Sequence, residues 1–266
     1  MNHSLRRLLY RVGPPLAAFV LFVGIWEAAV RIAELPTYLL PKPSDIVKSA
    51  LDNWSRLLGS ASTTLVETIL GFLFSVVGGV LGAILLASSK IIERSIYPYA
   101  IVLQTIPIVA VAPIIVIWFG AGVRSIVIVA FLIGFCPMLS NTLIGLNSTD
   151  KNLKNLFILY NATKWQTMWR LRIPAALPYI VGGLKISCSL CVIGAIVGEY
   201  VAGVGGGQGG LGYAITYAAM RIQTPYLFAC GLAASVLGIA FYQIVNFLSR
   251  KWLGSWHESE MRGENE

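Results

Sequence analysis

The chain has 266 residues, of which 56% are hydrophobic and only 12% are charged, and its formal net charge is +8. Its mean hydropathy of +0.74 and its low charge content exclude an ordinary soluble domain, in which about 25% of the residues are charged. The composition therefore predicts a membrane protein, and no feature of the sequence points to a nucleic acid as a partner.

Long runs without any charged residue locate the membrane helices, because about 20 apolar residues span a bilayer. These charge-free runs are 68–89, 95–123, 125–149, 200–220 and 222–249. Hydropathy together with turn residues predicts about six spans. The predicted spans are 14–33, 64–88, 97–119, 125–145, 178–203 and 225–249. The fold class expected is all-α, a polytopic membrane protein formed by a single domain over residues 1–266.

The first span follows a charged N-terminus, as in a signal peptide, but the apolar stretch continues to Glu27 and has no convincing small-x-small cleavage site. We therefore expect an uncleaved membrane helix. Residues 34–63 contain three prolines and then an amphipathic stretch, which predicts an extended segment followed by a surface helix.

Prolines punctuate the third and fourth spans at Pro107, Pro113 and Pro137. Kinks of this kind are tolerated in membrane helices and often line a pathway, although helix packing alone explains them equally well. The polar residues nearby that we consider candidates for a translocation path are Gln104, Thr105, Asn141 and Thr142.

A polar insert at residues 146–177 separates the fourth and fifth spans. Its first half carries an apolar stripe with helical spacing, formed by Leu153, Leu156, Phe157 and Tyr160. Asn161 tolerates the left-handed conformation that ends helices, and Thr163 and Gln166 have the spacing of a capping box. We predict a helical hairpin whose second helix stops at Pro174. An interfacial helix that only anchors the chain to membrane lipid is the alternative, since Trp165 and its basic neighbours suit that boundary.

Charged residues within or beside the spans suggest function, because ions in hydrocarbon are costly. They are Glu27, Glu67, Lys185 and Glu199. Glu199 precedes the glycine-rich segment 203–212, and we place it with Gln104, Thr105 and Asn141 on the candidate path, with helix packing as the alternative. The glycine-rich segment is interpreted as a re-entrant turn or gate, because no strand precedes it as a nucleotide-binding loop requires.

The four cysteines all fall in apolar runs, which favours buried thiols over a disulfide framework or a zinc site.

The orientation of the chain in the membrane follows from the basic residues, since cytoplasmic segments are rich in Lys and Arg. With both termini in the cytoplasm, the inner segments hold fourteen of the twenty Lys and Arg residues, including those of the insert.

The stretch "YNATKWQTMWRLRIPAALPYIVGGLKIS" resembles the cytoplasmic EAA loop of permeases from binding-protein-dependent ATP-binding cassette (ABC) importers. Asn161, Ala162 and Thr163 stand where that loop has Gly-Ala-Ser, whereas Asn155 stands where it has an acid. "LLPKPSDIV", "IPIVAVAPIIVIWFGAG", "NTLIGL" and "VGEYVAG...GGLGYAI" are similar to the branch that imports nitrate, sulfonates, taurine, and thiamine or riboflavin precursors.

The resemblance implies a type I ABC importer permease in the bacterial inner membrane, with a cytoplasmic coupling hairpin at about 150–174. The coupling residues that it implies are Tyr160, Asn161, Ala162, Thr163, Trp165 and Pro174. The partners that it implies are two copies of an ABC ATPase subunit, a second permease subunit that is expected to make a homodimer, and an extracytoplasmic substrate-binding protein.

No catalytic residue, bound cofactor or metal site is expected in this chain. It has no G-x-x-x-x-G-K-[ST] stretch, so ATP would be hydrolysed by the separate subunit. A secondary transporter or channel that works without an ATPase is the alternative. A membrane enzyme is the weaker alternative, because His3 and His257 lie at opposite ends of the chain.

Overall fold

The computed structural model describes residues 3–203 and 209–253, and all regular structure in these two ranges is helical. The prediction of an all-α polytopic protein is confirmed. The elements are α1 (His3–Ile32), α2 (Pro43–Asp52), α3 (Trp54–Ser88), α4 (Lys90–Thr105), α5 (Ile108–Phe119), α6 (Val123–Asn147), α7 (Lys151–Leu159), α8 (Lys164–Thr167), the π-helical turn η1 (Met168–Arg172), α9 (Ile173–Gly203), α10 (Leu211–Met220) and α11 (Thr224–Leu253).

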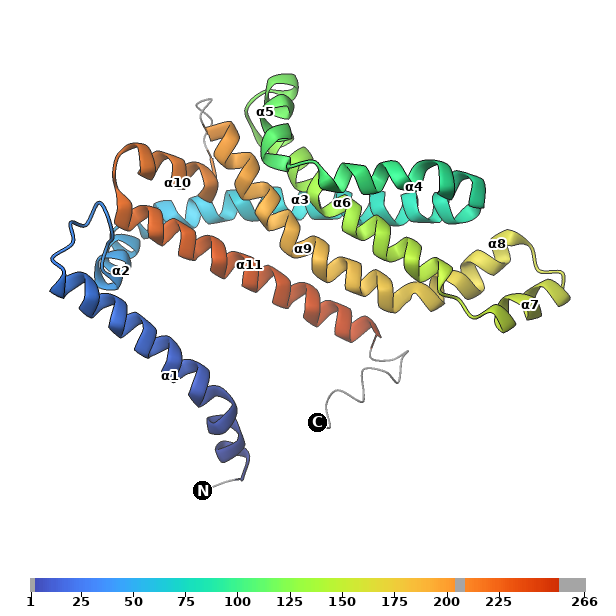
Figure 1. Ribbon diagram of the computed structural model, residues 1–266, viewed down its shortest axis with the longest axis horizontal. Helices are drawn as coiled ribbons and strands as arrows, with labels where there is room; N and C mark the ends of the chain where they lie inside the picture. The colour runs from blue at the N-terminus through green and yellow to red at the C-terminus, as the bar shows by residue number, and fades with distance from the viewer. Residues whose placement is uncertain (1–2, 204–208, 254–266) are drawn as a thin grey trace.

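Five helical segments in the described ranges are long and apolar enough to cross a membrane. They are Gly13–Ile32, Trp54–Ser88, Val123–Asn147, Lys164–Ala202 and Thr224–Lys251. The bent pair α4 and α5 makes a sixth if it counts as one span. Helices α6, α9 and α11 run in roughly the same oblique direction, α3 crosses behind them, and α7 and α8 project from one end of the bundle (Figure 1).

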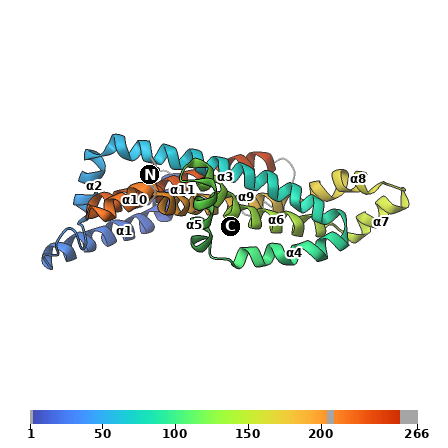
Figure 2. The same ribbon diagram turned by 90° about the horizontal axis from the view of Figure 1, so that it is seen from above.

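Helices α3, α6 and α9 form the centre of the bundle and lie side by side in both views (Figures 1 and 2). They approach closely through small residues, as membrane helices do. Ser75 Oγ of α3 donates to the Phe131 carbonyl of α6 at 2.9 Å, and Ser187 Oγ of α9 donates to the Gly134 carbonyl at 2.8 Å. A Cβ at Gly134 would overlap Ser75 and Cys191. The absence of a side chain at Gly134 therefore sets the spacing of all three helices.

All four cysteines are free and buried, as predicted for thiols that pack as small apolar residues. Cys188 and Cys191 lie on α9, and Cys191 Sγ donates to the Ala130 carbonyl of α6 at 3.4 Å. Cys230 of α11 lies in an apolar cluster with Leu57, Leu211 and Tyr226. This cluster joins α10 and α11 to the first turns of α3.

The third span is broken, whereas the sequence predicted one kinked helix over 97–119. Helix α4 ends at Thr105, α5 begins at Ile108, and their axes differ by 98°. Pro107 lacks an N–H and restricts the residue before it, and Ile106 is accordingly extended, with φ −74° and ψ 121°. Pro113 and Pro137, by contrast, lie inside α5 and α6. Only the first of the three prolines interrupts a helix.

The N-terminal segments differ from the prediction at their boundaries. The extended stretch and the amphipathic helix α2 are present, but α3 begins at Trp54 and not at residue 64.

Helix α10 was not predicted at all. Its residues belong to the charge-free run 200–220, which begins inside α9, so the absence of charge alone does not separate the two helices.

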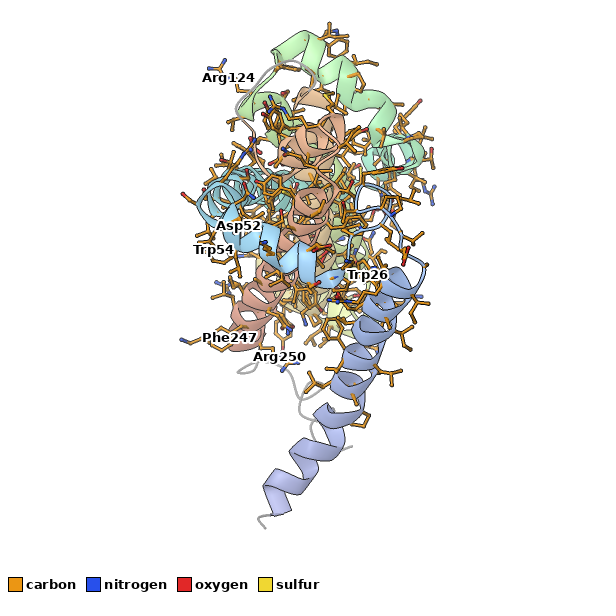
Figure 3. All side chains as sticks on the ribbon, turned by 90° about the vertical axis from the view of Figure 1, so that its left-hand side faces the viewer. Trp26, Asp52, Trp54, Arg124, Phe247 and Arg250 are labelled. Carbon is orange, nitrogen blue, oxygen red and sulfur yellow. The ribbon has the colours of Figure 1, made fainter. Side chains whose placement is uncertain are left out.

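Helix α1 contacts the rest of the molecule mainly near its C-terminal end. Trp26 lies 5.9 Å from Phe228 of α11 between ring centroids. In Figure 3, Trp26 marks where α1 passes the bundle, and the remainder of α1 extends away from it. Glu27 is explained locally, because it pairs with Arg31 at 2.6 Å and accepts hydrogen bonds from Ser44.

Candidate functional site

The hairpin begins with α7, and local hydrogen bonds define both of its ends. Asp150 caps the helix by accepting from the amides of Asn152 and Leu153 at 2.6 and 3.2 Å. At the C-terminal end, Asn161 adopts φ 51°, and the Ala162 amide donates to the carbonyl of Phe157 at 2.9 Å. This pattern is a Schellman motif. The predicted left-handed turn at Asn161 is confirmed.

The second arm of the hairpin begins with the predicted capping box at Thr163. The Thr163 amide donates to Gln166 Oε1 at 2.8 Å, and the Gln166 amide donates to Thr163 Oγ1 at 3.2 Å. These reciprocal bonds satisfy two amides that a helix start otherwise leaves without partners. The direction of the second arm is therefore set within a few residues.

Pro174 does not end the second arm, contrary to the prediction. The helix passes through the π-helical turn η1 into α9, and the combined segment Lys164–Ala202 is one candidate span. In η1 the Ile173 amide donates to the carbonyl of Met168, five residues back, which widens the helix just before the proline. The predicted start of the fifth span at 178 is also wrong for this reason.

Arg172 connects the base of the hairpin to the bundle by hydrogen bonds, a role that the sequence did not predict. Its Nη1 donates to the Ala87 carbonyl at 2.8 Å and its Nε donates to the Leu146 carbonyl at 3.0 Å. Its Nη2 donates to Asn147 Oδ1 at 2.9 Å. A single guanidinium thus joins the last residues of α3 and α6 to the hairpin. The signal available in the sequence was a basic residue between two apolar residues, Leu171 and Ile173.

The tip of the hairpin exposes large side chains. Tyr160 is 79% exposed and Trp165 is 67% exposed, and the rings of Trp165 and Trp169 lie 5.4 Å apart. Ala162 is half-buried. Pro174 lies at the base, so the six predicted coupling residues divide into five at the tip and one at the root.

A second polar cluster lies at the opposite end of the bundle, where α10 begins. Helix α10 has Gly210 at its N-cap position, which offers no side-chain acceptor. Thr64 of α3 accepts from the Leu211 amide at 2.8 Å, and Glu199 of α9 accepts from the Gly212 amide at 2.6 Å. Two side chains from other helices therefore cap α10.

Glu199 is only 1% exposed, and Glu67 beside it is 2% exposed. Oε1 of Glu199 and Oε2 of Glu67 are buried without a hydrogen-bond partner in the described structure. A Cβ at Gly210 would overlap both Glu199 and Thr64. The lack of a side chain at Gly210 therefore allows the start of α10 to lie close to the Glu199 carboxyl group. Of the glycine-rich segment predicted as a gate, residues 204–208 lie outside the described residues.

The other predicted path residues lie near the break between α4 and α5. Gln104 Nε2 donates to Ser140 Oγ of α6 at 3.0 Å, whereas Thr105 and Asn141 bond to carbonyls of their own helices. Glu199 is not among them. Its neighbour Gly198 packs on Ile126, which lies about 22 Å from Asn141 along α6.

Within residues 3–203 and 209–253, no three His, Cys, Asp or Glu side chains gather closely enough to hold a metal ion. The expectation that the chain binds no cofactor stays a prediction.

Comparison with known proteins gives concordant results. The family profile "Binding-protein-dependent transport system inner membrane component" matches residues 75–254. The formylaminopyrimidine transport permease protein ThiX of Halalkalibacterium halodurans is 37% identical over 240 residues, covering 90% of this chain and 94% of that protein. The riboflavin transport system permease protein RibX of Chloroflexus aurantiacus is 32% identical, covering 90% and 88%.

A solved structure supports the fold. The crystal structure of an amino acid ABC transporter with histidines superposes with a TM-score of 0.58 at 18% identity, covering 76% of this chain and 97% of that chain. At this level of identity the likeness concerns the fold alone.

Proposed function

Because the chain belongs to the family of binding-protein-dependent transport system inner membrane components and is a multi-pass permease of an ABC importer, we propose that its energy comes from a separate ATPase subunit that docks on the hairpin α7–α8. An ATPase groove that accepts a short helix would bind the exposed tip around Tyr160 and Trp165. A substrate-binding protein would dock at the opposite end, near α10.

The charges support a cytoplasmic position for the hairpin. The basic residues at its end of the bundle are Lys90, Arg94, Lys151, Lys154, Lys164, Arg170 and Arg172, against the acids Glu93 and Asp150. The opposite end has Arg31, Lys42, Lys48, Arg56, Arg124 and Arg221 with Glu27, Glu34, Asp45 and Asp52. The excess of positive charge at the hairpin end favours the cytoplasmic side, and we propose the same side for both termini.

The observation that carries the coupling proposal is the continuity of the second arm with α9. Between Lys164 and Ala202 no loop interrupts the helix. A displacement of the tip would therefore be transmitted along a helix, and the Arg172 bonds would carry it to the ends of α3 and α6. A hairpin joined through a flexible loop would lack this property.

The test is retention of the ATPase subunit during purification. Deletion of residues 159–165, or the double change Tyr160→Ala and Trp165→Ala, should abolish co-purification while the permease stays in the membrane. The matched control is Tyr38→Ala with Trp54→Ala, two exposed residues of the same types away from the hairpin (Trp54 is labelled in Figure 3). If both hairpin variants retained the ATPase, the coupling proposal would fail, and transport without an ATPase, as in a secondary transporter or channel, would have to be considered.

For the assembly we propose two permease copies, a homodimer, with two ATPase subunits. The membership of the chain in the importer permease family supports this, and the exposed Ile117 and Trp118 of α5 are candidate contacts between the copies. The mass of the purified complex measures the stoichiometry.

For the substrate we propose a vitamin precursor of the pyrimidine or flavin type, because relatives at 37% and 32% identity carry the names of formylaminopyrimidine and riboflavin permeases. A sulfonate or nitrate-type anion is the second candidate, supported by a putative aliphatic sulfonates permease of Bacillus subtilis at 29% identity. The polar group Gln104, Ser140 and Asn141 would lie on the path. A thermal-shift screen of the cognate binding protein distinguishes the two classes.

A further inference from the structure

A cavity of about 640 Å³ lies between the hairpin and the junction of α3 with α4. Four basic side chains line it, and apolar side chains including Ile158 and Met168 form the rest of its wall. The basic residues are Lys90, Lys154, Lys164 and Arg172. We call this space the basic cavity. Its lining is amphipathic, with positive charge on one part and hydrocarbon on another.

The positive charge of the basic cavity is not balanced by the protein around it. Glu93 is the acid in the lining, and its Oε1 accepts a hydrogen bond from Asn147 Nδ2 at 2.8 Å. None of the four basic residues forms an ion pair within the described ranges. Burial, together with the nearby charges of Arg172 and Lys90, lowers the pKa of Lys154. An added anion would relieve this repulsion.

The basic cavity lies where membrane spans end. Ser88 is the last residue of the α3 span and Lys90 begins the next helix, while Arg172 belongs to the α8–α9 span. The charged part is thus at the level of lipid headgroups, and Ile84 and Ala87 in the last turns of α3 line the cavity on its bilayer side. Basic pockets between membrane helices bind the headgroups of anionic lipids.

We propose that the basic cavity binds an anionic phospholipid, whose phosphate lies among Lys90, Lys154 and Arg172 and whose first acyl carbons pack on Ile84 and Ala87 of α3. A lipid held there contacts the hairpin and α4 together and links the hairpin to the bilayer surface. The proposal requires only that the hairpin end is at a membrane surface. It does not depend on which side of the membrane that is or on the ATPase partner.

The experiment is native mass spectrometry of the full chain in detergent, titrated with phosphatidylglycerol or with phosphatidylcholine of the same acyl chains. Phosphatidylglycerol should bind more tightly, and Lys90→Gln with Lys154→Gln should weaken its binding by about tenfold or more. The control is Arg94→Gln with Lys151→Gln, which removes the same charge from exposed positions on the same two helices, outside the lining. Lys90→Arg with Lys154→Arg should restore binding.

Several results would overturn the proposal. Equal binding of the two lipids, or equal losses in the two Gln variants, would show a general surface charge effect. Displacement of the lipid by an equimolar amount of inorganic phosphate would show a site for a soluble anion. Unchanged lipid binding with loss of the ATPase subunit in the Lys90 and Lys154 Gln variant would show that the cations serve that partner.

Discussion

The buried carboxyl group of Glu199 accepts a hydrogen bond that an N-cap side chain would otherwise accept at the start of α10. Gly210 precedes α10 and has no side chain that could accept from the first amides of the helix, so Thr64 and Glu199 accept from Leu211 and Gly212 instead. A carboxylate at a helix N-terminus is also favoured by the helix dipole. Glu199, which the sequence suggested for the path, therefore connects α9 to α10 by a hydrogen bond in this conformation.

This arrangement predicts that Gly210→Ala is destabilising. The added methyl group would overlap the Glu199 carboxyl group and the Thr64 hydroxyl, and overpacking of this kind costs about 1–3 kcal/mol. The thermal unfolding midpoint of the purified protein in detergent should fall. Gly182→Ala is the control, since a Cβ there meets nothing within 4 Å and an alanine within a helix is stabilising by roughly 0.5–1 kcal/mol. A Gly210→Ala protein as stable as the wild type would contradict the close approach.

The tip and the base of the hairpin are held in place by different kinds of contact. Its turn is local, because the Schellman motif at Asn161 and the capping box at Thr163 each involve residues no more than five positions apart. Its attachment is not local, because Arg172 bonds to carbonyls at the ends of α3 and α6. The tip is thus a preformed unit, and the base is part of the bundle.

Removal of the capping box should loosen the second arm without changing the base. Thr163→Ala loses the acceptor for the Gln166 amide, which costs about 1 kcal/mol and should raise the hydrogen-exchange rates of the amides in α8 by about fivefold. Thr163→Ser should retain protection. Thr167→Ala serves as a control, since the Thr167 hydroxyl bonds only to the main-chain carbonyl of Thr163 and to neither side chain of the capping box. Equal exchange in all of these proteins would show that the box does not set the start of the arm.

At the scale of the whole molecule, the long helices place the hairpin and α10 at opposite ends of one bundle (Figure 1). Positive charge accumulates at the hairpin end. The four native cysteines are buried, which makes single introduced cysteines useful reporters of each end.

Asn161→Cys should react with a membrane-impermeant maleimide only after the cytoplasmic face is opened, whereas Asp52→Cys should react in intact spheroplasts. Asn161 and Asp52 are both exposed, in the hairpin turn and at the end of α2 (Asp52 is labelled in Figure 3). The unsubstituted protein measures the background from the native thiols. Labelling with the opposite sidedness would reverse the orientation proposed from the charges.

Features that depend on near neighbours in the chain were predictable. Charge-free runs located α6, α11, the α4–α5 pair and most of α3, because the bilayer core requires about 20 apolar residues. The turn and cap of the hairpin followed from Asn161, Thr163 and Gln166. The burial of the four cysteines followed from their apolar surroundings. The resemblance in the hairpin and in the flanking spans identified the family that the comparisons show.

What the tertiary structure decided involves groups that are distant in the sequence. The Arg172 bond to Ala87 spans 85 residues and the Leu211 bond to Thr64 spans 147, so no local pattern encodes either contact. Proline alone did not reveal its effect either, since Pro107 precedes a 98° bend whereas the helix continues through Pro174 after a π-helical turn. Local sequence sets where a backbone hydrogen bond is lost, and packing against distant helices decides whether the chain bends there or continues.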